Sequence, residues 1–556
     1  MKRLISVALL SMLTYAVHAD VIINSTNFPD SNFRAYLLEQ DYGRDGKISK
    51  TEINEIAEIE VMERNISNLK GIEFFTELTN LYCTGNQLEV LDLSKNTALV
   101  GLDCGDNKLS TLDLSNNAEL DWLACGGNQL ATLDLSQNVK LMTLYCGGNQ
   151  LTTLDLSQNR ALKNVECQEN KLVTLDIPIL LEGESFVCSN NNLQKINIPS
   201  GLVLKELRCN DNSLISLEIP ENVNIEILSC YNNTISNLYV SKCSALKELD
   251  CTNNQLQILD VSKNIALVGL LCDVNQLKSL DVSKNTELWA LTCGSNQLSA
   301  LNVSNNLVLS YLDCSGNPLT TLNLSKNTAL ELLWCGESLL SNINVSMNTE
   351  LIELNCNDTN IKKLDLSNNT KLERLQCVNN QLGKLDLSNN TELTDLCCWG
   401  CKLTELNISN NTKLEWINCS LNYLKTLDVS SKSSLHYLEC VENSIRGEEM
   451  DKLVNALPQQ EDAEFRVVSI HTMWYPEKNV CTTGQVAIAR AKGWKVLDAD
   501  GNEYQGSDDS GIISISVKNK IAKEIYSLDG KRHNMLRKGI NIIRTNDNST
   551  RKMIAR

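Results

Sequence analysis

The sequence predicts a solenoid built mainly of β structure, in which right-handed coils of 21 residues stack and pair through a parallel sheet on one face. Eighteen of the 22 cysteines recur at intervals of 21 residues, from Cys83 to Cys440. Leucines recur at constant offsets around each of them, and hydrophobic residues make up 42% of the chain. A coil that cannot close its own core must stack on its neighbours, so this period predicts a repeat array.

One repeat unit is LTNLYCTGNQLEVLDLSKNTA, and eighteen such units cover residues 78–455. Side chains alternate along a strand, so we expect Leu81 and Cys83 to face the core and Tyr82 to face outward. Cysteines in register lie one strand spacing apart, about 4.8 Å, with parallel Cβ directions, whereas a disulfide needs converging ones. We therefore expect the cysteine ladder to consist of reduced, buried thiols.

Two polar columns accompany the ladder. An asparagine follows the cysteine by three residues in 15 of the 18 units, with Ser338, Thr359 and Cys401 as exceptions, and we expect its amide to satisfy backbone groups of adjacent coils. A second column consists of aspartates, for which we favour turn capping over a cation ladder. Its members are Asp92, Asp113, Asp134, Asp155 and Asp176. Prolines replace the following serine at Pro178, Pro199 and Pro220, and we expect the outer wall to be irregular there.

The unit LxxLxCxxNxLxxLDLSxN resembles the leucine-rich-repeat family, with cysteine in place of the leucine that normally ends the strand motif. It is similar to internalin-J-like cysteine-ladder repeats. This resemblance implies a leucine-rich-repeat solenoid and a role like that of internalin-like surface and adhesion proteins of bacteria.

The first 19 residues predict a secretory signal peptide. Lys2 and Arg3 precede an apolar stretch that ends in the small-residue exit Val17-His18-Ala19, and no later segment is long and apolar enough to span a membrane. We therefore expect a bacterial protein that is secreted or held at the outer cell surface.

Residues 20–77 predict a helical cap for the first coil. The segment DYGRDGKISKTE resembles an EF-hand or dockerin loop, which would make Asp41, Asp45, Ser49 and Glu52 ligands of Ca²⁺ and Gly46 the sharp turn. Gly43 stands where such loops normally carry Asp or Asn. Two interpretations stay open, a bound Ca²⁺ and an EF-hand-like cap without metal.

Two regions follow the repeats. Residues 456–510, with the helical pattern that precedes them from residue 446, alternate helix and strand patterns and predict a βα cap that continues the parallel sheet. Residues 511–556 predict a small β module, and residues 518–556 hold 11 basic and 3 acidic residues. Its motifs IYSLDGKR and KGINIIR resemble the C-terminal sorting domains of the type IX secretion system in Bacteroidetes. The alternative is a β module without sorting activity.

Composition and motifs exclude several classes of function. The net charge of −18 argues against nucleic acid as the main partner, because phosphate binding needs a basic surface. The four histidines, among them His436, His471 and His533, have no metal-ligand spacing, and neither a nucleophile elbow nor a phosphate-binding loop is present. We expect a protein without enzymatic activity. Four cysteines lie off the ladder, and a disulfide from Cys397 or Cys401 is a minor alternative; the others are Cys243 and Cys481.

The outward-facing columns next to the ladder predict a binding surface. The positions three and one before each cysteine, and one and two after it, hold 16 carboxylates, two arginines, no lysine and nine aromatics. Exposed aromatics dominate binding hot spots, although they can also merely strengthen cross-strand packing. The predicted binding residues are Tyr311, Asp313, Trp334, Glu353, Asp395, Trp399, Trp416, Tyr437 and Glu439.

We expect this surface to bind a protein or peptide with a basic patch, and the chain to be a monomer. Two alternatives stay open. A glycan could stack on the aromatics, and a structural coat protein would use none of them for binding.

Overall fold

The computed structural model describes residues 20–220, 223–470 and 477–508, and in the C-terminal region residues 522–527, 532–533, 539–545 and 550–555. The predicted signal peptide, His471 and every residue of the C-terminal module outside its four strands lie outside these ranges. The chain forms two compact units that divide between Leu288 and Trp289.

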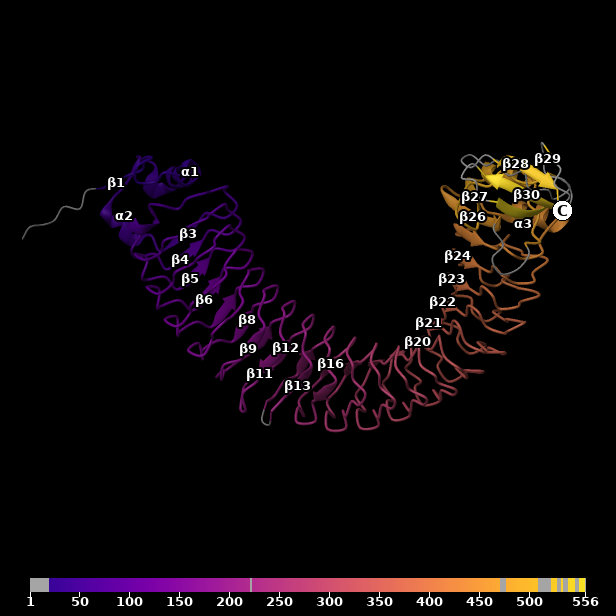
Figure 1. Cartoon of the computed structure of the whole chain (residues 1–556), viewed down its shortest axis with the longest axis horizontal. Helices are drawn as coiled ribbons and strands as arrows, with labels where there is room; N and C mark the ends of the chain where they lie inside the picture. Colours follow the sequence, from indigo (N-terminus) through magenta and orange to yellow (C-terminus); the bar gives the residue numbers. More distant parts are fainter. Residues whose placement is uncertain are drawn as a thin grey trace, which may run out of the picture. The chain divides into compact units, whose positions relative to one another are not determined.

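The first unit begins with a cap around two short helices (Figure 1). The carboxylate of Asp30 accepts hydrogen bonds from the backbone N–H groups of Asn32 and Phe33, so α1 starts directly after it. Phe33 and Leu37 are fully buried. The elements are β1 (Val21–Ile22), α1 (Ser31–Glu39), η1 (Asp41–Gly43), β2 (Lys47–Ile48) and α2 (Lys50–Glu55), and η2 (Ile72–Phe74) follows the first strand of the main sheet.

Parallel strands with a 21-residue register form the main sheet of the first unit. Asn80 pairs with Gly101, which pairs with Trp122, and the pattern repeats coil after coil. The sheet starts inside the segment predicted as cap, because Glu58 pairs with Asn80. The strands are β3 (Glu58–Glu60), β4 (Asn80–Tyr82), β5 (Gly101–Asp103), β6 (Trp122–Ala124), β7 (Thr143–Tyr145), β8 (Asn164–Glu166), β10 (Ser185–Val187), β12 (Glu206–Arg208), β14 (Ile227–Ser229), β16 (Glu248–Asp250) and β17 (Gly269–Leu271).

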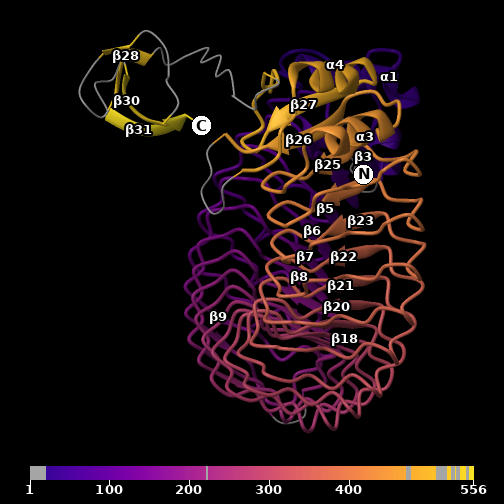
Figure 2. The same cartoon turned by 90° about the vertical axis from the view of Figure 1, so that its right-hand side faces the viewer.

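The second unit continues the same design and ends in the predicted βα cap. Its repeat strands are β18 (Ala290–Thr292), β19 (Tyr311–Asp313), β20 (Leu332–Trp334), β21 (Glu353–Asn355), β22 (Arg374–Gln376), β23 (Asp395–Cys397), β24 (Trp416–Asn418) and β25 (Tyr437–Glu439). The cap adds α3 (Glu448–Ala456), β26 (Ala463–Val468), α4 (Thr483–Ala491) and β27 (Trp494–Asp498), with β26 and β27 parallel to the repeat strands (Figure 2).

The C-terminal module is a four-stranded antiparallel sheet in the order β29-β28-β30-β31. Figure 2 shows β28, β30 and β31 together. The strands are β28 (Ala522–Ser527), β29 (Arg532–His533), β30 (Gly539–Thr545) and β31 (Thr550–Ala555).

The core confirms the predicted inside and outside of the repeat. All eighteen ladder cysteines are fully buried and carry free thiols. The predicted asparagine column bridges neighbouring coils, as Asn128 illustrates. Its Oδ1 accepts the Leu109 N–H at 2.9 Å, and its Nδ2 donates to the carbonyls of Cys104 and Cys125 at 3.0 and 3.1 Å. Each coil therefore satisfies buried backbone groups of the coil before it.

A second buried asparagine column, which the repeat pattern contains but to which the sequence analysis gave no role, runs along the turn after LDLS. Asn117 is fully buried, and its Nδ2 donates to the carbonyls of Leu93 and Asn96 at 3.2 and 2.8 Å. Cys243 and Lys432 occupy positions of this same column. Both side chains are buried, so Cys243 is a core residue of a repeat that lacks the asparagine.

Four of the five predicted aspartates cap turns, as favoured from the sequence: Asp92, Asp113, Asp134 and Asp155. Asp176 instead lies in a strand of the outer wall and accepts a hydrogen bond from the Asn197 side chain. The Asp113 carboxylate accepts the Ser115 N–H at 3.0 Å, and Asn302 makes the same contact to Ser304 at 3.1 Å. Because a neutral amide does the same work, the column needs no cation. The hydrogen bonds from Ser115 lower the pKa of Asp113.

The expectation of an irregular wall at the three prolines is wrong. Here the outer wall forms short parallel strands, with β9 (Thr174–Asp176) paired to β11 (Lys195–Asn197), and β13 (Ser216–Glu218) paired to β15 (Asn237–Tyr239). Proline has no N–H to donate to the side chain two residues before it, so the capped turn cannot form at these three positions. Elsewhere the serine N–H closes that turn.

Candidate functional site

The candidate site is the strand face of the second unit, where the register aligns outward-facing side chains in two rows. From β19 to β25, one row follows the first residue of each strand and the other follows the third, and Glu464 and Arg466 of β26 continue the two rows. The first row is Tyr311, Leu332, Glu353, Arg374, Asp395, Trp416, Tyr437 and Glu464. The second row is Asp313, Trp334, Asn355, Gln376, Cys397, Asn418, Glu439 and Arg466. Eight of the nine predicted binding residues lie in these rows, and Trp399 lies in the turn after β23.

Four of the predicted residues gather on β19 to β21 as the upstream cluster, Tyr311, Asp313, Trp334 and Glu353. The rings of Tyr311 and Trp334 meet edge to face at 5.8 Å and 78°. The Trp334 indole N–H donates to Glu353 Oε1 at 2.8 Å, and Arg374 forms an ion pair with the same carboxylate. Glu353 is only 8% exposed. This carboxylate orients Trp334 and is already neutralised, so it adds little to an acidic field.

The downstream cluster, Asp395, Trp416, Tyr437 and Glu439, carries the flatter aromatic surface. The rings of Trp416 and Tyr437 stack with centroids 5.0 Å apart and planes 9° apart. The Tyr437 hydroxyl donates to Glu439 Oε2 at 2.7 Å. Burial and this acceptor raise the pKa of Tyr437, so the phenol keeps its proton. The stack therefore presents apolar area beside a carboxylate.

The C-terminal cap completes the downstream cluster with two residues that sequence reasoning missed. The Arg466 guanidinium lies over the Tyr437 ring at 5.6 Å and pairs with Glu464 at 3.1 Å. Both residues belong to β26, which lies beyond the last 21-residue repeat. The repeat period therefore could not predict their positions next to Tyr437. The strand pattern FRVV was visible in the sequence, but its register against β25 was not.

A third aromatic group lies in the first unit. Trp122 contacts Tyr82 at 6.3 Å and Tyr145 at 6.5 Å between ring centroids. Gly101 lies on the intervening strand, where a Cβ would lie 2.5 Å from the Asn80 side-chain oxygen. In the sequence, this group is marked by a glycine at an outward-facing strand position between two coils that carry aromatic residues.

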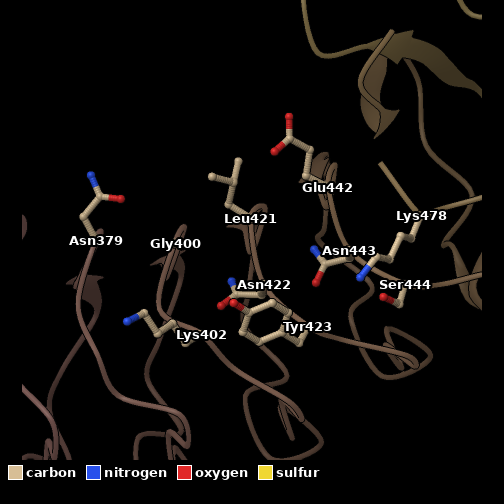
Figure 3. A pocket seen from close by; sticks show the side chains of 10 residues that line it. All are labelled: Asn379, Gly400, Lys402, Leu421, Asn422, Tyr423, Glu442, Asn443, Ser444 and Lys478. Atoms are coloured by element: carbon tan, nitrogen blue, oxygen red, sulfur yellow. The ribbon is translucent and has the colours of Figure 1, made fainter. Parts of the chain in front are cut away.

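A hollow lies along the turns that follow β22 to β25 (Figure 3). One wall consists of the second residue after each cysteine, all with positive φ: Asn379, Gly400, Leu421 and Glu442. Figure 3 shows the Tyr423 ring between Lys402 on one side and Lys478 on the other. Tyr423 is 45% exposed. This edge thus offers ammonium groups and one aromatic ring beside a face that otherwise carries acids.

The EF-hand-like loop folds as a turn and a helix start. Gly46 has a φ of 84°, as the predicted sharp turn requires. Ser49 and Glu52 form the capping box of α2, with the Ser49 N–H donating to Glu52 Oε2 at 2.7 Å. Gly43 cannot carry the missing ligand, since a Cβ there would lie 1.9 Å from the Leu37 carbonyl oxygen.

The predicted calcium ligands are held by other partners. Asp41 pairs with Arg44 at 2.9 Å, and Asp45 accepts the Lys47 N–H at 3.1 Å. Within the part of the chain that the structure describes, no three His, Cys, Asp or Glu side chains are grouped to hold a metal ion. The loop as folded does not fit Ca²⁺, and binding there stays a prediction that requires Asp41 and Glu52 to change partners.

The off-ladder cysteines all carry free thiols. Cys243, Cys401 and Cys481 are fully buried, whereas Cys397 is half-buried and faces outward from β23. Burial raises the pKa of Cys397 to about 11, so its thiol is protonated at neutral pH.

The fold has clear structural relatives. No protein-family model matches the sequence, and no curated protein is significantly similar to it. The functional domain of InlJ from Listeria monocytogenes, which includes a cysteine ladder, is 25% identical over 96% of this chain and 98% of that domain, with a TM-score of 0.45. A leucine-rich-repeat protein from Leptospira interrogans is 19% identical over 74% of this chain and 96% of its own, with a TM-score of 0.51.

The leucine-rich-repeat ectodomain of the plant receptor kinase GASSHO1/SCHENGEN3 from Arabidopsis thaliana, solved in complex with CASPARIAN STRIP INTEGRITY FACTOR 2, has a TM-score of 0.53. It is 21% identical over 77% of this chain and 56% of its own. Together with the buried cysteine ladder and the parallel coils, the likenesses to the Leptospira and Arabidopsis structures establish the fold: the chain is a leucine-rich-repeat solenoid. Among the described residues, no helix has the length and apolar character needed to cross a membrane.

Proposed function

We propose that this protein is a non-enzymatic binding protein that recognises a protein partner through the strand face of its second unit. The observation that carries the proposal is the downstream cluster, in which Trp416 and Tyr437 stack at 5.0 Å next to Glu439. Stacked, half-buried aromatics on a rigid sheet bury apolar area at low entropic cost when a partner covers them. Core packing does not require them, because Leu438 and Cys440 already fill the interior of that coil.

Charge favours a partner with a basic patch. Asp395 lies one strand before Trp416, Glu439 lies beside Tyr437, and the chain carries a net charge of −18. Glu353 and Glu464 are paired with arginines and add little to this field. The Arabidopsis ectodomain with this fold was solved in complex with CASPARIAN STRIP INTEGRITY FACTOR 2, which supports the use of the fold for recognition.

Capture of partners tests the proposal. The intact chain is immobilised, exposed to secreted and cell-surface protein extracts, and compared with a Trp416→Ala/Tyr437→Ala double variant. The matched control is Tyr239→Ala, because Tyr239 is an aromatic 57% exposed on the outer wall of the first unit. We expect the parent chain and the control to retain a protein that the double variant does not retain. After purification, this protein should bind the parent chain again. Equal retention by all three chains would contradict the proposal.

Two alternatives predict different results. A glycan partner would be displaced by free sugars and would be insensitive to salt, and the exposed Tyr423 ring between two lysines is the feature that favours it. A structural coat role predicts that no captured molecule depends on Trp416 or Tyr437.

We also propose that the protein acts outside the cell that makes it, as a monomer, and that the C-terminal sheet is a type IX sorting module. The predicted signal peptide, the basic tail and the small antiparallel sheet β28–β31 support this. Deletion of residues 511–556 should then retain the protein inside the producing cell, whereas a module without sorting activity leaves export unchanged. Chromatography with light scattering tests the monomer.

A further inference from the structure

We propose that Cys377 and Cys401 form a disulfide site. Thiol–disulfide exchange with a small disulfide would convert this pair of thiols into a covalent link between two neighbouring coils. The sulfur atoms are 3.9 Å apart, and the Cys401 thiol also lies 2.8 Å from the Cys377 carbonyl oxygen. Both side chains are fully buried. A disulfide bond needs the sulfurs to approach by about 2 Å, and the proposal requires side-chain rotation at both residues to bring them together.

The position of Cys401 explains why this pair differs from the ladder. Ladder cysteines come from the same position of successive coils, so their Cβ directions are parallel. Cys401 comes instead from the asparagine column, whose side chains reach back to the previous coil. Asn380, one coil earlier, donates to the Cys356 carbonyl at 2.8 Å in the same way. A thiol in this column is therefore aimed at the ladder cysteine of the coil before it.

Cys401 keeps only part of the column's hydrogen bonding, mainly the contact of its thiol with the Cys377 carbonyl of the previous coil. The other two exceptions keep an oxygen that bonds the cysteine carbonyl of their own coil, with Ser338 to Cys335 at 2.9 Å and Thr359 to Cys356 at 3.1 Å. Cys401 keeps no such oxygen. Metal binding does not account for it, because no group of metal-ligating side chains was found among the described residues.

The contact also differentiates the two thiols. The hydrogen bond from Cys377 lowers the pKa of Cys401, whereas the same contact and burial raise the pKa of Cys377. The thiolate is the nucleophile in exchange, so Cys401 reacts first.

The reaction is ordinary thiol–disulfide exchange. The Cys401 thiolate attacks one sulfur of a small disulfide RSSR, releases RS⁻ and becomes a mixed disulfide. The Cys377 thiolate then attacks the Cys401 sulfur and releases the second RS⁻. Two protein thiols are oxidised, RSSR is reduced to two RSH, and the two protein protons end on the released thiolates. Export, which the sequence predicts, would bring the chain into an oxidising environment.

Mass spectrometry of the intact chain tests the site. The purified, reduced protein is incubated under native conditions with 2-hydroxyethyl disulfide, alkylated, digested and analysed. We expect a peptide linked through Cys377 and Cys401, and a fall of two in the number of free thiols from the 22 of the reduced chain. No thiol loss from the folded chain, or a link between other cysteines in its place, would overturn the proposal.

Two variants and one further measurement make the result specific. Cys401→Asn restores the residue of the column and should abolish the link, while Cys397→Ser, which removes the half-buried neighbouring thiol, should leave it intact. In the linked form, amides of residues 378–400 should exchange with solvent about tenfold more slowly, because the link closes the loop between the two coils. Dithiothreitol should restore the original rate. Equal exchange in both forms would show that the link does not hold the coils.

Discussion

Single residues in this molecule are best understood as members of columns, because every repeat position has up to eighteen counterparts. Cys243 and Lys432 are surprising in isolation but occupy the second asparagine column, and both are buried there. Asn479 in the C-terminal cap continues the first column, since its Oδ1 accepts the Ile445 N–H at 2.8 Å and its Nδ2 donates to the Cys440 carbonyl at 2.8 Å. A departure from a column therefore predicts a local change in stability.

Restoring the column at Cys401 should stabilise the second unit. Elsewhere the asparagine accepts a backbone N–H of the previous coil, as Asn422 does from Leu403 at 2.8 Å. The Cys401 thiol offers no amide oxygen to the equivalent Leu382 N–H. We expect Cys401→Asn to raise the free energy of unfolding by about 1 kcal/mol, the net value of a buried hydrogen bond.

The urea midpoint of the reduced chain measures this effect. The reciprocal control is Asn422→Cys one coil later, which should lower the midpoint. A Cys401→Asn variant that unfolds at the same or a lower urea concentration would show that the column does not govern stability at this coil.

Glu477 should make the stability of the C-terminal cap depend on pH. Its carboxylate accepts three backbone N–H groups, from Glu442, Ser469 and Asn479, at 2.7–2.8 Å. Burial nevertheless raises the pKa of this carboxyl from 4.5 to about 7. The folded state then binds more protons than the unfolded state between these values, so stability is fully present below pH 4.5 and is lost as the pH rises through 7.

We expect the free energy of unfolding of the parent chain to fall by roughly 2–3 kcal/mol between pH 4.5 and 8 through this carboxyl, and we expect no such fall in Glu477→Gln. Urea unfolding at the two pH values measures this. Glu405→Gln is the control, because Glu405 is an exposed member of a surface ion pair with Lys384. Identical pH dependence in the parent and Glu477→Gln would contradict the assignment.

At the level of elements, the period predicted most of the architecture and the departures came from backbone chemistry. The 21-residue interval fixes which residues pair, so strands such as β24 and β25 could be placed to the residue. The extended outer wall at Pro178 could not be predicted from the period. The missing N–H of this proline removes a capped turn and no hydrogen bond between strands. β3 was missed because its coil lacks the ladder cysteine and its partner Asn80 lies 22 residues later, off the period.

The asparagine ladder should carry a large share of the stability of each coil. Asn128→Ala removes the acceptor of the buried Leu109 N–H and the donor to the carbonyls of Cys104 and Cys125. Leaving such groups unpaired costs about 2–4 kcal/mol. Hydrogen exchange of the Leu109 amide should therefore accelerate strongly. Gln129→Ala, on the exposed neighbour, should leave it unchanged, and equal exchange in both variants would contradict the role of the ladder.

For the whole molecule, the sequence predicted where a binding face would be but not how much of its charge is free. Column counting found Trp416, Tyr437 and Glu439, because burial alternates along every strand. It could not show that Glu353 is neutralised by Arg374, since side-chain pairing across coils depends on rotamers. It also could not place Arg466 over Tyr437, since that residue belongs to the cap. The unpaired charge on this face is therefore less than the columns implied, and the binding site that we propose is confined to the downstream cluster.

The net charge of −18 leads to the last prediction, which concerns how fast a captured protein partner associates. If its surface is basic, long-range attraction accelerates encounter at low salt, and we expect the association rate to fall about tenfold or more as ionic strength rises from about 0.05 to 0.5 M. Stopped-flow fluorescence measures this rate. Asp395→Asn with Glu439→Gln should lower it at low salt. Asp428→Asn should not, because Asp428 caps a turn on the outer wall where Asn407 makes the same contact. A rate that is independent of salt and of both sets of substitutions would mean that charge does not guide the partner to this face, and displacement of the partner by free sugars would favour the glycan alternative instead.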